Sequence, residues 1–453
     1  MKRVIILGAG ESGVGSAILA KKMEYEVFLT DSGSIKPHYK EMLNQWDIEY
    51  EELGHTLEKL CDAELCIKSP GIPDSVAVVS HIKENGIAII SEIEFAYRYS
   101  NAKTICITGS NGKTTTATFT YNILKNAGYN VALVGNIGQS YAYMVATADV
   151  DYYVLELSSF QLDGMFNFKA DVAIITNITP DHLDRYNYDF NLYRRSKFRI
   201  TQNMTKEDCL IYSTDDENTL AYIFNNQELF TMYNTSFSTK DTLLEGGYIN
   251  QKGDIELNIE GHELIIERDK IKLMGTHNLY NIMAASLAAL RLGVDSQYIL
   301  QTAYSFEGVE HRMEIICKKD DVIYINDSKA TNVDAAYYAL QSIDRPIVWV
   351  AGGTDKGNDY SILKDVVKGK VTTLVCMGLD NKKLVDSFTS VIPFIYSTSS
   401  LEEAVEVIRT IYKPGDCVLL SPACASFDLF DNYMHRGEMF KQAILKLEPK
   451  IRE

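Results

Sequence analysis

The sequence predicts an α/β protein of three domains: a Rossmann-like N-terminal domain, a central domain of the phosphate-loop ATPase type, and a C-terminal Rossmann-like domain. Short apolar runs that end in glycine or polar turns alternate with helix-like stretches along the chain. This alternation is typical of parallel sheets covered by helices. The length of 453 residues suits about three domains. We place them at residues 1–98, 99–308 and 309–453.

The composition excludes several classes of protein. The apolar fraction of 46% is ordinary for a globular chain, and no apolar run is long enough to span a bilayer. The N-terminus opens a short strand without the apolar region of a signal peptide. Eight scattered cysteines include no Cys-x-x-Cys pair, which suggests neither a zinc site nor a disulfide framework. We therefore expect a cytoplasmic protein that does not bind membranes.

The formal net charge of −17 argues against nucleic acid and anionic membranes as partners. If the ligands are phosphates, this charge repels them, so basic residues must be concentrated in the site. Lysines and arginines within glycine-rich or acidic motifs are therefore the candidates.

The N-terminal domain opens with a glycine-rich turn. Residues 3–7 form an apolar run, Gly8 to Gly13 fit G-x-G-x-x-G, and the next strand, residues 27–31, ends on Asp31. This pattern indicates a ribose and a diphosphate at a helix N-terminus, but it does not identify the nucleotide. A nicotinamide dehydrogenase and a turn without a ligand are both compatible with it.

A second glycine turn, at residues 108–115, opens the central domain. It follows the apolar run 104–107 and precedes a helix-like stretch, residues 116–127. Gly109 and Gly112 allow the backbone to approach phosphate oxygens, Lys113 can reach the β- and γ-phosphates, and the Thr114 hydroxyl can bind Mg²⁺. The general phosphate-loop pattern has four residues between its glycines, whereas this loop has two. A glycine turn with a surface lysine is the alternative, but the strand before the loop and the helix after it favour a nucleotide loop.

Two further strands of this domain end in candidate metal ligands. Glu156 closes the strand 152–155, where a second Mg²⁺-binding group belongs, although a strand-end carboxylate is also common without a ligand. His182 follows the strand 172–177 and is flanked by Asp181 and Asp184, as in a metal ligand oriented by carboxylates. A single loop histidine is as often inert.

The rest of the central domain carries weaker signals. Residues 191–204 indicate a helix, in which Lys197 belongs to a basic run typical of a solvated face. Residues 210–272 are less regular, with strand-like pieces near 248–249 and 255–259. An apolar helix then runs from Gly275 to Leu292, and Asn281 falls one turn after His277. Core packing is the ordinary interpretation of that helix.

In the C-terminal domain, strands at 322–325, 347–351, 372–377 and 417–421 alternate with helical stretches. Lys329 and Lys356 follow the ends of two of these strands. Because ligands meet the carboxyl ends of parallel strands, this shared placement favours anion binding over two unrelated surface charges.

With these motifs, the chain resembles the Mur ligase family over essentially its whole length. The residues that carry the resemblance are 108–115, 156–162, 326–332 and 421–428, and the short glycine loop is the family's own version. The last three motifs are similar to the branch that uses D-glutamate. The resemblance implies an ATP-dependent ligase that joins D-glutamate to UDP-N-acetylmuramoyl-L-alanine through an acyl phosphate, with two Mg²⁺ ions.

The resemblance also implies a role for each motif residue. It implies catalytic roles for Lys113, Glu156, His182 and Lys197. It implies metal ligands at Thr114, Glu156, His182 and a CO₂-derived carbamate on Lys197. It implies ATP binding by Gly109, Ser110, Asn111, Gly112, Lys113, Thr114, Thr115, Asn278, Asn281, Arg312 and Asp327. It implies UDP-substrate binding by Gly10, Glu11, Ser12, Asp31, Ser32, Gly71 and Asn136. It implies D-glutamate binding by Lys329, Thr331, Lys356, Ser426 and Tyr433.

The resemblance replaces two interpretations based on the residues alone. The first glycine turn would serve a uridine diphosphate rather than a nicotinamide cofactor, and Lys197 would be a ligand rather than a solvated charge. Family members often carry an arginine after the acid of the second strand, where this chain has Ser32 and Gly33. We expect small-molecule partners only and a monomer. A sister ligase, which would add another amino acid or act on folate, and a nucleotide-binding module without activity are the alternatives.

Overall fold

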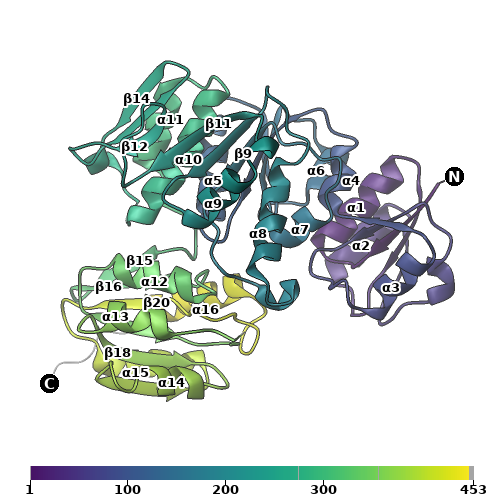
Figure 1. Cartoon of the computed structure of the whole chain (residues 1–453). Coiled ribbons are helices and arrows are strands. Elements are labelled where there is room, and N and C mark those ends of the chain that lie inside the picture. Colours follow the sequence, from purple (N-terminus) through teal and green to yellow (C-terminus); the bar gives the residue numbers. More distant parts are fainter. Residues whose placement is uncertain (1, 274, 356, 448–453) are drawn as a thin grey trace. The chain divides into compact units, whose positions relative to one another are not determined.

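The computed structural model describes residues 2–273, 275–355 and 357–447, and it confirms the predicted α/β class (Figure 1). The described chain builds three separate sheets. It forms two compact units, one of residues 1–271 and 279–305 and the other of residues 272–278 and 306–453. Within the described ranges, every helix is too short or too polar to cross a lipid bilayer.

The N-terminal sheet has the order β3-β2-β1-β4-β5, and all of its strand pairs are parallel. Its elements are β1 (Arg3–Leu7), α1 (Glu11–Lys22), β2 (Glu26–Thr30), α2 (Pro37–Gln45), β3 (Glu49–Glu51), β4 (Leu65–Lys68), α3 (Ala77–Glu84), β5 (Ala88–Ile90) and α4 (Glu92–Tyr97). The apolar run that predicted β1 is buried. Since β2 ends at Thr30, Asp31 lies in the loop beyond the strand.

The central sheet has the order β14-β13-β12-β11-β10-β9-β6-β8-β7. Its first half contains β6 (Lys103–Thr108), α5 (Lys113–Asn126), β7 (Val131–Gly135), α6 (Tyr141–Thr147), β8 (Tyr152–Glu156), α7 (Ser159–Asp163), β9 (Val172–Ile175) and α8 (Phe190–Phe198). Its second half contains β10 (Cys209–Ser213), α9 (Glu217–Asn225), β11 (Tyr233–Ser238), β12 (Gly246–Ile249), β13 (Ile255–Ile259), β14 (His262–Ile266), α10 (Thr276–Arg291) and α11 (Ser296–Ser305). Strands β6 to β12 pair in parallel, and β13 and β14 extend one edge of the sheet as antiparallel strands.

Two predictions for this domain need correction. The helix expected over 191–204 ends at Phe198, a short 3-10 turn follows over Arg199–Thr201, and Asn203 has a positive φ of 64° that an α-helix cannot contain. The stretch 210–272 is more regular than its sequence pattern. Its last two strands form a hairpin whose turn residues Glu260 and Gly261 have φ values of 51° and 81°, as a tight hairpin turn requires.

The C-terminal sheet has the order β15-β16-β20-β17-β18-β19, and only its edge strand β15 is antiparallel. Its elements are β15 (Glu314–Lys319), β16 (Val322–Asn326), α12 (Val333–Gln341), β17 (Ile347–Ala351), α13 (Lys364–Val367), β18 (Val371–Met377), α14 (Lys382–Phe388), β19 (Phe394–Thr398), α15 (Leu401–Ile411), β20 (Cys417–Leu420) and α16 (Tyr433–Leu445). Alternate strand residues feed two apolar clusters, one around Trp349 and Phe388 and one around Val350 and Phe440, so both faces are covered.

Helices α1 and α6 join the N-terminal and central sheets within the first unit. A Cβ at Gly15 would lie 2.0 Å from the Ser140 Oγ, so α1 can approach α6 only with glycine at this position. The Ser140 backbone N–H donates to the Glu11 carboxylate at 3.1 Å. The buried Glu92 carboxylate accepts from the Ser140 hydroxyl at 2.5 Å and from the Ala142 N–H at 3.0 Å. Burial raises the pKa of Glu92 to about 7 because it disfavours the ionised form.

We expect Glu92→Gln to change how stability depends on pH. Above the ordinary pKa of 4.5 and up to about 7, the folded chain keeps a proton on Glu92 that the unfolded chain releases, so wild-type stability falls as pH rises. Glutamine keeps the acceptor oxygen but cannot ionise, so the variant should gain stability relative to wild type across this window. Urea unfolding at a series of pH values measures the difference. The exposed Glu84→Gln on α3 is the control. If the unfolding free energies of wild type and Glu92→Gln depend on pH in the same way, the raised pKa of Glu92 is contradicted.

Candidate active site

The loop between β6 and α5 depends on two glycines. Gly109 has a φ of 143° and Gly112 a φ of 85°, a region that L-residues rarely adopt. A Cβ at Gly109 would lie 2.0 Å from the Thr176 hydroxyl oxygen, and one at Gly112 would lie 2.5 Å from the Asn281 amide oxygen. Both glycines are therefore required by conformation and by space.

The end of β9, which lies beside β6, anchors this loop. The Ser110 N–H donates to the Asn177 carbonyl at 2.8 Å, and the Asn111 N–H donates to the Asn177 side-chain oxygen at 3.0 Å. The Thr176 hydroxyl donates to the Asn111 carbonyl at 2.6 Å, and the Ser110 hydroxyl donates to the Thr179 carbonyl at 2.8 Å. We did not predict these anchors. Polar residues at the carboxyl end of a parallel strand are the signal that could have indicated them.

Two lysine side chains meet at one carbonyl of the loop. Lys113 Nζ donates to the carbonyls of Gly109 and Ser110, each at 2.8 Å. Lys197 Nζ donates to the same Gly109 carbonyl at 3.0 Å and lies 3.4 Å from the Thr108 hydroxyl.

Lys197 is buried, so its interpretation from the residues alone as a solvated charge is wrong: this position of α8 faces the interior. Burial lowers the pKa of Lys197 well below its ordinary value, and the positive charge of Lys113 lowers it further. These surroundings favour the neutral amine, which is a nucleophile.

Two polar side chains donate hydrogen bonds to Glu156 at the end of β8. Its buried carboxylate accepts from the Thr114 hydroxyl at 2.7 Å and from the Asn136 amide at 2.8 Å. A hydroxyl and a carboxylate are hard oxygen donors of the kind that Mg²⁺ prefers. In the described part of the chain, no group of three or more His, Cys, Asp or Glu side chains is placed to hold a metal.

His182 lies in the loop after β9, with a φ of 52°. Its side chain is 38% exposed, its Nε2 lies 3.8 Å from a carboxylate oxygen of Asp181, and its ring meets Phe160 edge-on at 5.1 Å. One of the two flanking acids, Asp181, thus lies near the imidazole.

The loop after β2 is tied to the first glycine turn through Asp31. Its carboxylate accepts from the Ala9 N–H and from the Gly33 N–H, both at 2.7 Å. Ser12 is half-buried, and its hydroxyl lies 3.5 Å from that of Ser69. The remaining predicted residues of this region, Gly10, Ser32 and Gly71, are exposed.

In the second unit, Asp327 and Lys329 follow β16. Asp327 is buried, and its carboxylate accepts from the Ser421 hydroxyl at 2.9 Å and from the Met313 N–H at 3.2 Å. Burial raises the pKa of Asp327 to about 6. Lys329 Nζ lies 3.4 Å from the Tyr433 hydroxyl and 5.1 Å from the centre of its ring.

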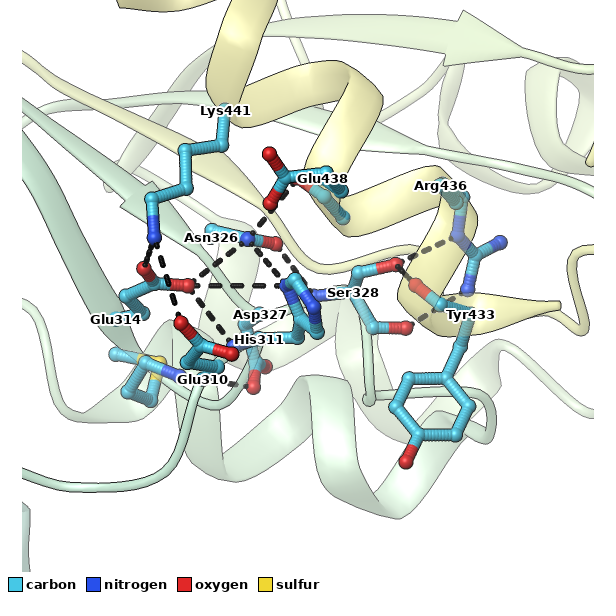
Figure 2. A network of polar contacts seen from close by, with 12 residues as sticks. Glu310, His311, Glu314, Asn326, Asp327, Ser328, Tyr433, Arg436, Glu438 and Lys441 are labelled. Atoms are coloured by element: carbon cyan, nitrogen blue, oxygen red, sulfur yellow. Dashed lines mark hydrogen bonds and ion pairs between the residues drawn. The ribbon is translucent and has the colours of Figure 1, made fainter.

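Other predicted residues of the second unit differ in burial. Ser426 and Asn278 are buried, whereas Thr331 is half-buried. Lys356 lies outside the described residues. Figure 2 shows a network of polar side chains around the end of β16. In it, the Asn326 amide lies 2.9 Å from His311 Nδ1 and donates to Glu314 at 3.1 Å.

Two buried polar atoms at predicted ATP-binding positions have no hydrogen-bond partner in the described structure. They are the Thr115 hydroxyl oxygen, in the first turn of α5, and the Nε of Arg312. Buried donors normally have a partner, so an external acceptor such as a phosphate suits both atoms.

Two glycines that flank α5 allow the cost of backbone conformation to be separated from the cost of steric overlap. Gly112 and Gly128 share a φ of 85°, but only at Gly112 does a Cβ meet another atom, the Asn281 oxygen at 2.5 Å. Each change to alanine should cost about 1–2 kcal/mol for the left-handed backbone. Gly112→Ala should cost about 1–3 kcal/mol more because Asn281 must move. Urea unfolding measures both, and equal destabilisation of the two variants would show that the loop has room for a side chain.

Three family models match the chain in order. They are a MurD N-terminal domain at residues 3–78, a Mur ligase middle domain at residues 107–289, and a Mur ligase glutamate ligase domain at residues 311–424.

Curated relatives extend over the whole chain. A UDP-N-acetylmuramoylalanine–D-glutamate ligase of Christiangramia forsetii is 48% identical over 98% of this chain and 100% of its own length. Proteins of the same name from Bacteroides fragilis and Chlorobium limicola are 45% and 40% identical, each over 99% of this chain and over 100% and 99% of their own lengths.

Solved structures share the fold at low identity. The UDP-N-acetylmuramate-alanine ligase of Thermotoga maritima superposes with a TM-score of 0.65 at 18% identity, covering 99% of this chain and 100% of its own. MurF of Acinetobacter baumannii gives 0.61 at 17% identity, covering 82% and 87%.

Proposed function

We propose that this chain, which belongs to the Mur ligase family, is the ATP-dependent ligase that joins D-glutamate to UDP-N-acetylmuramoyl-L-alanine in peptidoglycan precursor synthesis. The observation that carries the substrate is the match to relatives of that name along the full chain at 40–48% identity. The Lys113 loop, with Thr114 and Glu156 beside it, supplies matching chemistry.

We propose one substrate for each domain. Residues 1–98 would hold the uridine diphosphate portion, residues 99–308 would bind ATP, and residues 309–453 would bind D-glutamate. The three matched family models have the same order. We further propose that the chain acts as a monomer in the cytoplasm.

ATP would lie with its phosphates on the loop from Gly109 to Gly112. The backbone N–H groups and Lys113 would contact the phosphates, because the loop leads into a helix N-terminus. The further ATP-binding residues would be Ser110, Asn111, Thr114, Thr115, Asn278, Asn281, Arg312 and Asp327. Thr114 and Glu156 would hold one Mg²⁺, whose charge offsets the repulsion between ATP and an anionic substrate.

The reaction needs an activated acid because a carboxylate is a poor acyl donor. The terminal carboxylate of UDP-N-acetylmuramoyl-L-alanine attacks the γ-phosphorus of ATP, and ADP leaves. The D-glutamate amine then attacks the acyl phosphate carbonyl, loses a proton and releases phosphate. Lys113 stabilises the phosphoryl charge, mainly through positioning and electrostatics.

We propose that Lys197 is carbamylated. Its amine is held toward the neutral form, so it can add CO₂ with loss of a proton. The resulting carbamate is an anionic oxygen ligand, and it would hold a second Mg²⁺ together with His182. Negative charge on Lys197 would also replace the repulsion with Lys113 by attraction.

The two other substrates would be held by loops at strand ends. We propose that Gly10, Glu11, Ser12, Asp31, Ser32, Gly71 and Asn136 hold the UDP substrate. We propose that Lys329, Thr331, Lys356, Ser426 and Tyr433 hold the D-glutamate carboxylates. The contact of Lys329 with Tyr433 supports their joint role.

Phosphate release tests the proposal. Release should require ATP, Mg²⁺, UDP-N-acetylmuramoyl-L-alanine and D-glutamate together, and other amino acids should not replace D-glutamate. Lys113→Ala should lower the rate about 100- to 1000-fold while the protein stays folded. The exposed Lys125→Ala, near the other end of α5, is the matched control.

Each alternative predicts a different result. Release with another amino acid, or with a folate substrate, would indicate a sister ligase. ATP binding without turnover would indicate a module without activity, and NADH binding would restore the dehydrogenase interpretation. Normal turnover by Lys113→Ala would refute the role of the loop.

A further inference from the structure

Arg436, on helix α16, is a buried arginine that no step above uses; its side chain is 1% exposed. Its Nε donates to the Ser328 hydroxyl at 2.9 Å, and its Nη2 donates to the carbonyls of Ser328 at 2.8 Å and Cys424 at 3.2 Å. Its Nη1 donates to the carbonyls of Cys424 at 3.2 Å and Gly352 at 3.4 Å. These contacts occupy the five N–H donors of a guanidinium group.

The three acceptor residues follow three neighbouring parallel strands. Ser328 follows β16, Cys424 follows β20 and Gly352 follows β17, and the sheet order is β16-β20-β17. Arg436 therefore ties together three loops at the carboxyl edge of one sheet, the edge where ligands meet such sheets.

Each of these loops carries a residue that we propose for D-glutamate. Ser328 directly precedes Lys329, Cys424 lies two residues before Ser426, and Gly352 begins the segment that leads to Lys356. The Ser328 hydroxyl, which accepts from Arg436, also donates to the Tyr433 carbonyl at 2.8 Å (Figure 2). The arginine thus reaches both Lys329 and Tyr433 through Ser328.

The loops after β17 and β20 are in close contact with each other and with Arg436. A Cβ at Gly353 would lie 2.1 Å from the Ala425 carbonyl and 3.3 Å from Arg436 Nη1. Thr354 and Ala425 exchange backbone hydrogen bonds of 2.8 and 3.2 Å. A small shift of one loop would therefore be passed to the next.

The guanidinium is a cation that hydrogen-bonds only neutral groups. Among the described residues, its hydrogen-bond acceptors are three carbonyls and one hydroxyl, with no carboxylate. Burial lowers the pKa of Arg436 to about 10, so the group remains charged at neutral pH. A lysine has three donors on a point charge and cannot reproduce this planar set of contacts.

We propose that Arg436 is a positioning residue for the amino-acid substrate: it holds the three loops in the arrangement that receives the D-glutamate carboxylates. This inference rests on the proposed function. Since its N–H groups are occupied by the protein, Arg436 acts through Ser328, Gly352 and Cys424 rather than by touching the substrate.

Steady-state kinetics of Arg436→Lys and Arg436→Met test the role. Each variant loses charge-assisted hydrogen bonds, so the KM for D-glutamate should rise about 10- to 100-fold. The KM for UDP-N-acetylmuramoyl-L-alanine should stay within about twofold of wild type, because its proposed binding residues lie in the first unit. The KM for ATP should rise less than the KM for D-glutamate, because Asp327 is the only proposed ATP-binding residue on a loop that Arg436 holds. Arg409→Met, on the exposed face of α15 in the same unit, is the matched control and should change none of them.

Amide hydrogen exchange supplies a second readout that needs no substrate. Residues 326–332 and 421–428 should exchange faster in both Arg436 variants than in wild type and Arg409→Met, while the strand cores stay protected. If wild type releases no phosphate with D-glutamate, the proposed function fails, and the exchange result still decides whether Arg436 fixes the loops.

Two results would overturn the proposal: an unchanged KM for D-glutamate in a folded Arg436→Lys, or an equal rise in all three KM values. If neither Arg436 variant folds, Ser328→Ala tests the proposal instead, because it removes only the hydroxyl that links Arg436 to the Tyr433 carbonyl. Its KM for D-glutamate should rise severalfold, and a wild-type value would overturn the proposal.

Discussion

The site in the first unit depends on the carbonyl of Gly109, where two lysine side chains converge. Lys113 and Lys197 both donate to it, at 2.8 and 3.0 Å, inside a loop that β9 holds by hydrogen bonds. Two ammonium groups at one acceptor repel each other, and the buried one gives up its proton more easily. The same loop leads into α5, which places Thr114 against Glu156. The arrangement therefore combines a buried amine whose neutral form is favoured with a hydroxyl and a carboxylate side by side, the groups that the proposed carbamate and Mg²⁺ site require.

The two units hold their loops in related ways. In the first unit, the Asn177 side chain donates to the Asn111 carbonyl and accepts from the Asn111 N–H. In the second unit, the buried Arg436 donates hydrogen bonds to the loops that follow three strands. In both units, a polar side chain distant in sequence satisfies backbone groups that the end of a strand leaves open. This keeps polar loops ordered at the carboxyl edge of a sheet, where substrates would bind.

Much of this could be predicted from the sequence. Apolar runs followed by glycine predicted β1 and β6, and the apolar run that ends at Glu156 predicted β8. The residues alone failed at Lys197, because a basic run on a short helix looks solvated and burial depends on which neighbour covers the helix. The Asn177 and Arg436 contacts were not predicted either. They depend on strand order, which brings β9 beside β6 and β20 between β16 and β17.

Carbon-13 NMR of the protein in labelled bicarbonate tests whether Lys197, paired with Lys113, forms a carbamate. We expect a carbamate resonance in wild type that disappears in Lys197→Arg. It should persist in Lys169→Arg, since the ion pair of Lys169 with Asp208 raises the pKa of Lys169 and keeps it protonated. A wild-type protein without the resonance, or a resonance that survives in Lys197→Arg, would show that Lys197 is not the carbamylated lysine.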